Sequence, residues 1–347
     1  MQGIEWLVGE LGDLIRNNMS EGPLKDLLVD GIIGGVGGVI VFLPNILLLY
    51  FFISLMEDSG YMARAAFIMD KIMHKMGLHG KSFIPLIMGF GCNVPAIMAS
   101  RTIENRKSRL VTMLINPLMS CSARLPIYLL LAGAFFPNNA SFVLLVIYAI
   151  GILLAVVMAR LFCRFLVKGD DTPFVMELPN YRMPGLKSVA LLLWEKAKDF
   201  LQKAFTVILI ATMLIWFLQS FDIHFNMVTD SKDSMLAAIS SIIVPVFKPL
   251  GLGDWRICTS LISGLMAKES VVSTLEILFG GTVTTALTTL SAASLLVFSL
   301  LYSPCVAAIA SIKRELGAKW AVSVVLLQCA IAWVAAFIVR VIGLLVM

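Results

Sequence analysis

The sequence predicts an all-α integral membrane protein, with about eight to ten transmembrane or re-entrant helices by hydropathy-window reasoning. Of the 347 residues, 59% are hydrophobic and 14% are charged, and the mean hydropathy is +0.92. A soluble domain carries about a quarter charged residues. Uncharged runs such as residues 31–56 and 320–339 are long enough for the helix of about 20 residues that crosses a bilayer. Because lipid satisfies no backbone hydrogen bond, such runs must be helical.

Along the chain, the pattern predicts two related membrane repeats joined by a polar linker. Residues 1–30 form an amphipathic segment that we expect on the membrane surface. Residues 31–167 make up the first repeat and residues 204–347 the second. Between them, residues 168–203 begin with a proline-rich stretch and continue with an amphipathic pattern. This order indicates a linker followed by an interfacial helix.

Two short sequence echoes support a duplication of one unit. Residues 60–64 resemble residues 264–268, each at the end of an apolar run. In addition, Arg101 follows Cys92 at the same spacing as Arg314 follows Cys305. Transporters are often built from such repeats, with the substrate site at broken helices between them.

Charge and cysteine usage exclude several classes of protein. The net charge is +5, but the basic residues gather in short clusters between apolar runs. That placement follows the positive-inside rule and indicates a lipid bilayer as partner, not a nucleic acid. The six cysteines lie in or beside apolar runs without a close-spaced extracellular pattern, so a disulfide framework is not expected.

Nucleotide chemistry has no motif in this sequence. Gly80-Lys81-Ser82 ends like a phosphate-binding loop, but Lys75 stands where that motif requires its first glycine. We therefore expect this chain to bind no nucleotide and to be no enzyme. The three histidines lie in polar connections without ligand-like neighbours at helical spacing, which leaves a catalytic zinc centre unsupported.

A helix break is predicted around Cys92. Gly89, Gly91 and Pro95 interrupt an otherwise spanning run, and proline removes a backbone donor and clashes with the preceding turn. A break at membrane depth exposes backbone carbonyls beside Cys92 and Asn93. The alternative is a packing kink around a small buried cysteine, since a free cysteine usually behaves as an inert hydrophobe.

Two further apolar runs join prolines to cysteines. The first encloses a charge, Arg124, whose burial in a membrane costs at least a few kcal/mol unless it faces a partner or water, and this cost argues for a functional cavity. The second is short and ends an apolar run. Their polar and helix-breaking residues are Asn116, Pro117, Ser120, Cys121, Ser122 and Pro126 in the first, and Pro304 and Cys305 in the second.

Three cysteines at helix breaks indicate a metal pathway. Thiolate sulfur is a soft ligand for divalent iron, copper or zinc, and the bound cation stabilises the deprotonated form. Met62 and Met266 could add thioether contacts, although most methionines fill gaps between helices. Glu57 and Glu269 stand at the ends of the echoed segments, where they could attract a cation or instead cap helices and pair with Arg64 and Lys268.

These motifs resemble the ferrous iron transport protein B (FeoB) family along nearly the whole chain. The residues that carry the resemblance are Gly35-Val-Gly-Gly38, Phe42-Leu-Pro44, Glu57-Asp-Ser-Gly-Tyr-Met-Ala-Arg-Ala-Ala66, Gly89-Phe-Gly-Cys-Asn-Val-Pro-Ala96, Asn116-Pro-Leu-Met-Ser-Cys-Ser-Ala-Arg-Leu-Pro-Ile-Tyr128, Glu177-Leu-Pro-Asn-Tyr-Arg182, Gly264-Leu-Met-Ala-Lys-Glu269 and Tyr302-Ser-Pro-Cys305. In that family the two membrane halves are called Gate regions. The resemblance implies that they conduct Fe²⁺, the transported substrate, into the cytoplasm across the bacterial inner membrane, along a path lined by Cys92, Cys121 and Cys305.

The same resemblance implies partners. Family members normally begin with a GTP-binding domain and a helical regulatory domain, whereas this chain begins just before the first membrane helix. A GTP-binding domain, fused or separate, is therefore an expected regulatory partner. A small FeoA-like accessory protein and a second copy of the chain are further expected partners.

Two other functions compete with iron transport. In a nucleoside or other small-solute carrier of the Gate type, Asn93, Asn116, Ser120 and Ser122 would hydrogen-bond a sugar or a base. A membrane scaffold would recruit soluble proteins through residues 168–203. Polar, proline-broken helices argue against a scaffold, because a scaffold needs no such costly interior.

Overall fold

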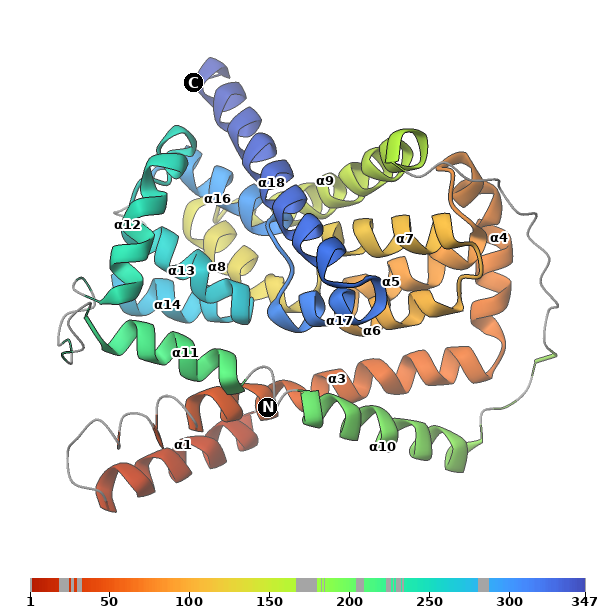
Figure 1. The fold of residues 1–347 in the computed structure, drawn as a ribbon, viewed down its shortest axis with the longest axis horizontal. Coiled ribbons are helices and arrows are strands. Elements are labelled where there is room, and N and C mark those ends of the chain that lie inside the picture. Colours follow the sequence, from red (N-terminus) through yellow and green to blue (C-terminus); the bar gives the residue numbers. More distant parts are fainter. Residues whose placement is uncertain are drawn as a thin grey trace. The chain divides into compact units, whose positions relative to one another are not determined.

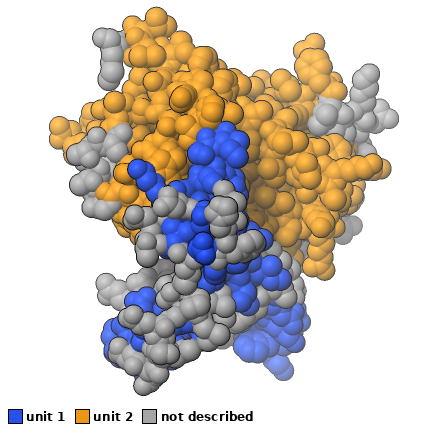
Figure 2. All heavy atoms as spheres, turned by 60° about the vertical axis from the view of Figure 1, so that its left-hand side comes forward, with its two compact units in different colours: residues 1–55, 184–243 blue, residues 56–183, 244–347 orange. Residues whose placement is uncertain are grey.

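The computed structural model confirms an all-α fold. It describes residues 2–18, 33–166, 185–203, 209–222, 234–279 and 287–346, together with a few isolated residues between these ranges. Every regular element of two or more residues in these ranges is a helix (Figure 1). The chain divides into two compact units, coloured separately in Figure 2. Each unit draws residues from both of the predicted repeats.

The smaller unit comprises residues 1–55 and 184–243. Its elements are α1 (Gln2–Asn18), most of α3 (Gly34–Asp58), α10 (Leu186–Lys203), α11 (Leu209–Ser220) and most of α12 (Met235–Phe247). Helices α1 and α10 match the two segments expected to be amphipathic. Their large apolar side chains Trp6, Leu14 and Trp194 are between 58% and 71% exposed. The location of these helices on a membrane surface stays a prediction. Residues 168–179 of the predicted linker lie outside the described residues.

The larger unit comprises residues 56–183 and 244–347 and holds every cysteine of the predicted path. Its helices are α4 (Tyr61–Lys75), α5 (Phe83–Gly91), α6 (Asn93–Ala99), α7 (Arg106–Ile115), α8 (Leu125–Phe135), α9 (Ala140–Leu161), α13 (Trp255–Met266), α14 (Ser270–Phe279), α16 (Thr289–Leu301), α17 (Val306–Leu316) and α18 (Ala318–Val346). Helix α16 packs against α8, α9 and α18, and its residues 294–301 are all buried. Because three neighbouring helices cover it, α16 lies in the core of this unit.

Four stretches of the described chain are long and apolar enough to cross a membrane. They are Arg106–Phe135, Ala140–Phe165, Thr289–Leu316 and Ala318–Leu345. A fifth span is possible if Met235–Leu250 and Trp255–Met266, which meet at a bend of 106°, form one broken span. Other expected spans are interrupted, because residues 83–100 divide into α5 and α6 at Cys92. The membrane segments in the described part of the chain are therefore of two kinds, long apolar stretches and short helices separated by a break.

Candidate functional site

The break at Cys92 lies where its glycines and proline allow it. Cys92 has an extended backbone (φ −152°, ψ 128°) between α5 and α6, and its N–H closes the last turn of α5 on the Met88 carbonyl at 3.0 Å. Gly91 is the last residue of α5, and Pro95 stands in the first turn of α6. The first turn of a helix has no internal acceptors for its N–H groups, so proline is tolerated there.

A second break, after α7, packs directly against the first. The Asn116 side chain lies so close to Gly89 that a Cβ on Gly89 would overlap Asn116 Oδ1. The Asn93 side-chain amide is oriented so that its nitrogen faces acceptors. This nitrogen donates to the backbone carbonyl oxygens of Gly89 (3.2 Å) and Asn116 (3.3 Å). Ser122 Oγ donates to the Gly91 carbonyl at 2.9 Å. Each break therefore supplies a side chain that donates to a backbone carbonyl of the other break, Asn93 to Asn116 and Ser122 to Gly91.

Arg124 connects the second break to the third. Its side chain is only 1% exposed. Nη1 donates to the Pro117 carbonyl and Nη2 to the Tyr302 carbonyl, each at 3.2 Å. These carbonyls belong to the proline-containing breaks themselves. The cost of burying Arg124, which the sequence predicts, is thus offset by backbone acceptors that a continuous helix would have occupied.

The third break separates α16 from α17. Tyr302 directly follows α16 as its C-terminal cap, and Pro304 lies in the connection. Cys305 precedes the first residue of α17 with an extended backbone (φ −64°, ψ 157°). Helices α6 and α17 lie side by side (Figure 1). Each begins directly after a cysteine, at matching positions of the second sequence echo. The first echo behaves differently, since Gly60 precedes α4 whereas Gly264 lies inside α13.

The three thiols lie within electrostatic range of one another. Cys92 interacts with Cys305 and Cys121, and Cys305 interacts with Cys121. All three are free cysteines, with Cys121 buried and the other two partly exposed. Glu269 interacts with both Cys92 and Cys305. Within the described residues, no three His, Cys, Asp or Glu side chains stand close enough to hold a metal ion as they are.

A buried lysine completes this interior and was not among the candidate site residues from the sequence. Lys268 follows α13, is 4% exposed, and places Nζ 3.2 Å from the centroid of the Tyr302 ring. The Tyr302 hydroxyl reaches Gly264, where a Cβ would overlap it. The sequence contains one indication of this residue, because Lys268 stands at the end of an apolar run and matches Arg64 in the first sequence echo. Arg64 itself lies 3.5 Å above the Tyr181 ring.

The other predicted residues lie on several elements. Glu57 is exposed near the end of α3, and Met62 is buried in α4. Met266, the last residue of α13, is partly buried, as is Glu269. Ser120 Oγ donates to the Tyr128 hydroxyl at 3.0 Å. Pro117 and Pro126 both stand in the first turn of a helical segment.

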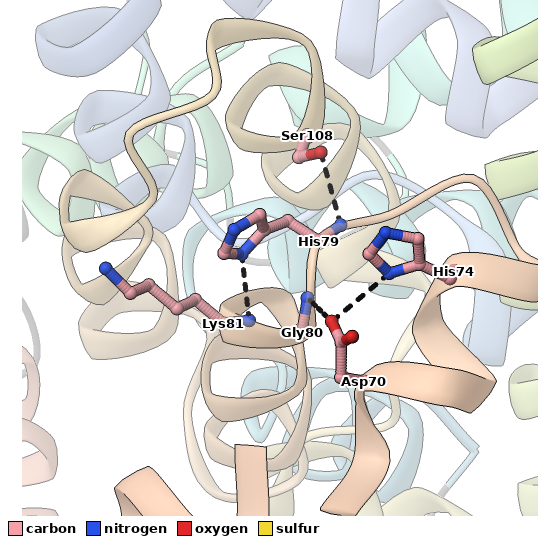
Figure 3. Close-up of polar contacts among 6 residues, drawn as sticks. All are labelled: Asp70, His74, His79, Gly80, Lys81 and Ser108. Carbon is pink, nitrogen blue, oxygen red and sulfur yellow. Dashed lines mark hydrogen bonds and ion pairs between the residues drawn. The ribbon is translucent and has the colours of Figure 1, made fainter. Parts of the chain in front are cut away.

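One expectation about the histidines was wrong. His74 lies inside α4 and its Nδ1 is 3.2 Å from Oδ1 of Asp70, one helical turn earlier (Figure 3). Asp70 also accepts a hydrogen bond of 3.0 Å from the Gly80 N–H. An i, i+4 pair on a helix surface is close enough to interact. His74 therefore lies in a helix and has Asp70 as a partner at helical spacing, whereas the sequence predicts a polar connection without such a neighbour.

The Gly80-Lys81-Ser82 turn is held by side chains. The Lys81 N–H donates to His79 Nδ1 at 3.3 Å, and the His79 N–H donates to Ser108 Oγ at 3.2 Å (Figure 3). The amides that a phosphate-binding loop would direct at a phosphate are thus used internally. Burial, followed by the nearby Lys81 ammonium, lowers the pKa of His79 from its usual value.

The fold and this interior define a multi-pass membrane protein with polar, broken helices in its core. A family model described as "Nucleoside recognition", Gate, matches residues 39–135 and 201–319. A second model, described as "Ferrous iron transport protein B C terminus", matches residues 144–196. The chain belongs to the FeoB family, and the resemblance stated from the sequence is confirmed.

Curated relatives support this membership. A Fe(2+) transport protein A/Fe(2+) transporter FeoB fusion protein of Porphyromonas gingivalis is 49% identical over 99% of this chain and 47% of its own length. A Fe(2+) transporter FeoB of Methanocaldococcus jannaschii is 44% identical over 98% of this chain and 53% of its own length. One from Campylobacter jejuni is 42% identical over 97% of this chain and 59% of its own length. The chain thus spans about half the length of these relatives. No solved structure matches it.

Proposed function

We propose that this chain forms the membrane part of a ferrous-iron transporter and that Fe²⁺ crosses the bilayer along Cys92, Cys121 and Cys305. The observation that carries the proposal is the gathering of three free thiols, each at a break between helices, within electrostatic range of one another. Thiolate is a suitable ligand for Fe²⁺. The relatives named Fe(2+) transporter FeoB support iron as the substrate.

The broken helices would supply the rest of the path. Carbonyl groups at helix ends are hard ligands that can replace part of a cation's water shell. Metal binding requires deprotonated thiols and some approach of the three cysteines, since they do not form a finished metal site here. Glu269 interacts electrostatically with two of them and would add negative charge for an incoming cation. Asn93, Ser120 and Ser122 hold the breaks in place through hydrogen bonds.

The assembly that we propose extends beyond this chain. Regulation by a GTP-binding domain and insertion in a bacterial inner membrane accord with the family. The Porphyromonas gingivalis relative is named a fusion of transport protein A with FeoB, which supports an FeoA-like partner. A second copy of the chain remains a further proposed partner.

One observation favours a second function, the recognition of a small polar solute. The Asn116 side chain is fully buried, and neither its Nδ2 nor its Oδ1 has a hydrogen-bond partner within the described structure. A buried amide of this kind could bind a nucleoside base. The description of the matching Gate model points the same way.

An anaerobic Fe²⁺ titration of the purified chain in detergent separates the two functions. The variant Cys92→Ser/Cys121→Ser/Cys305→Ser is compared with a control, Cys163→Ser/Cys258→Ser, which changes two cysteines outside the cluster. We expect saturable binding in the parent and the control and its loss in the triple variant. Equal binding in all three chains, or competition by nucleosides, would overturn the thiol path.

A further inference from the structure

Arg340 is a cation near the end of an otherwise apolar helix. It lies on α18, five residues before the end of the stretch Ala318–Leu345, which is long and apolar enough to cross a membrane. Its Nη1 is buried without a hydrogen-bond partner, and no carboxylate of the described ranges lies at ion-pair distance from it. A guanidinium has five N–H donors and keeps its charge in proteins. Because a desolvated charge without an acceptor is costly, an acceptor from outside these ranges would stabilise it.

The Arg340 guanidinium lies against the turn that precedes α13. Gly251 in this turn has φ +75°, and a Cβ there would overlap Nη1 and Cζ of Arg340. Ser291 Oγ lies 2.7 Å from the same Cβ position. Two turns earlier on α18, Trp333 Nε1 donates to the Val246 carbonyl at 2.9 Å. Helix α18 therefore contacts this part of the larger unit at two points, and a glycine leaves room for the guanidinium at one of them.

A second cation, Lys248, belongs to the same turn. Its side chain lies against Gly253, where a Cβ would stand 3.1 Å from Lys248 Cγ. Lys248 is exposed, and no ion pair of the described chain includes it. The neighbouring acid, Asp254, caps α13 by accepting a hydrogen bond of 2.9 Å from the Arg256 N–H. The turn thus brings two cations to one place without an ion-pair partner for either, and an anion bound there would interact favourably with both.

The depth of Arg340 along α18 matches the headgroup boundary of a bilayer. The stretch Ala318–Leu345 has 28 residues, which measure about 42 Å as a helix. A bilayer with its headgroups is about 40–45 Å thick around a hydrocarbon core of about 30 Å. Arg340 is about 8 Å from the end of the stretch, at the edge of that core. Near the two cations in sequence, Val246 and Ile342 are 55% and 54% exposed, which offers apolar surface to acyl chains.

We propose that Arg340 and Lys248 bind a phosphate group, and that in the membrane this group belongs to the headgroup of an anionic phospholipid. The planar fork of an arginine pairs with two phosphate oxygens at once, whereas a lysine adds a compact point charge on a flexible stem. The acyl chains would lie along the exposed apolar side chains beside these cations. A bound lipid would hold α18 on the turn before α13. This site does not depend on the thiol path.

Native mass spectrometry of the purified chain tests the site with two lipids. The probes are dioleoylphosphatidylglycerol and dioleoylglycerol, which has the same acyl chains without the phosphate. We expect retention of the phospholipid to fall about tenfold in Arg340→Gln and about fivefold in Lys248→Gln. Arg340→Lys keeps the charge but loses the fork, so its retention should fall only about threefold.

The control is Lys319→Gln, which removes an exposed charge at the other end of α18. Its retention of the phospholipid should stay within about twofold of the parent, since a solvated charge contributes little. Equal retention in Arg340→Gln and Lys319→Gln overturns the proposal. So does equal retention of the two lipids by the parent chain.

A second measurement uses the unmodified chain, so that it does not depend on the folding of a variant. Phenylglyoxal modifies guanidinium groups, and mass spectrometry reports the modified fraction of each arginine. We expect modification of Arg340 to fall several-fold with dioleoylphosphatidylglycerol relative to dioleoylglycerol. Modification of the exposed Arg106 should change much less, because water and salt screen an exposed cation. An unchanged fraction at Arg340 would mean that water alone solvates it, and would overturn the site.

Inorganic phosphate separates a lipid headgroup from a free anion as the source of the phosphate. If a large excess leaves the retained phospholipid and the modification of Arg340 unchanged, the lipid is the ligand, as proposed. If inorganic phosphate displaces the phospholipid and protects Arg340 by itself, the assignment to a lipid is overturned.

Discussion

The Arg124 guanidinium donates a hydrogen bond of 3.2 Å to the carbonyl oxygen of Tyr302, 178 residues further along the chain. Its other terminal nitrogen binds the Pro117 carbonyl. One buried cation thus joins the helix breaks that carry Cys121 and Cys305. Positions of the thiols depend on this link, because each cysteine follows a break that Arg124 holds.

Replacing Arg124 should therefore destabilise the chain. Arg124→Gln leaves at least one buried carbonyl without a donor, and such a loss costs about 2–4 kcal/mol of unfolding free energy. Denaturation in detergent, followed by circular dichroism, measures it. The exposed Arg106 provides the control, because Arg106→Gln should change stability by less than about 0.5 kcal/mol. Equal stabilities of the two variants would show that the buried link contributes nothing.

Gly89 should not tolerate a methyl group. In Gly89→Ala the new Cβ overlaps Asn116 Oδ1, so α5 or the second break must shift, at a cost of about 1–3 kcal/mol. Gly133→Ala is the matched control within α8, since nothing lies within 4 Å of its Cβ position. It should be neutral or stabilising by up to about 1 kcal/mol. Melting temperatures of the two variants in one detergent check this, and similar values would contradict it.

The connection at His79 should weaken in acid. His79 Nδ1 accepts the Lys81 N–H, which requires the unprotonated ring, and burial lowers the pKa of His79. A histidine whose folded-state pKa lies below its unfolded value of about 6.5 stabilises the fold above that value. This contribution is lost as the pH falls through the folded-state pKa. Melting temperatures between pH 7.5 and about 5 should fall more steeply for the parent than for His79→Gln. Parallel curves would rule out this residue as a contributor.

The ion pair between Arg101 and Glu315 should contribute little. Nε of Arg101 donates to Glu315 at 2.7 Å, joining the end of the α6 segment to α17. Arg101 is well exposed, so a double-mutant cycle with Arg101→Gln and Glu315→Gln should give about 0.2–1 kcal/mol. The coupling should shrink in 1 M salt. A coupling above about 2 kcal/mol would indicate a latch between the two helices.

The sequence predicts the membrane class and the broken helices, because both follow from local patterns. Long runs without charge indicate membrane-spanning segments, and the glycines and proline around Cys92 predict a helix break. Contacts between distant segments leave no local pattern. The contact of Lys268 with the Tyr302 ring and the contact of Asn116 with Gly89 could be found only in the folded structure. For His74 the reverse holds. Its partner Asp70 is at helical spacing and could have been found from the sequence, but the stretch was interpreted as a polar connection and not as a helix.

X-ray absorption at the iron K-edge tests most directly whether the three cysteines bind iron. The chain is loaded anaerobically with slightly less than one equivalent of Fe²⁺, beside the triple serine variant. We predict sulfur neighbours around iron in the parent and none in the variant. A first shell made only of oxygen and nitrogen in the parent would contradict it.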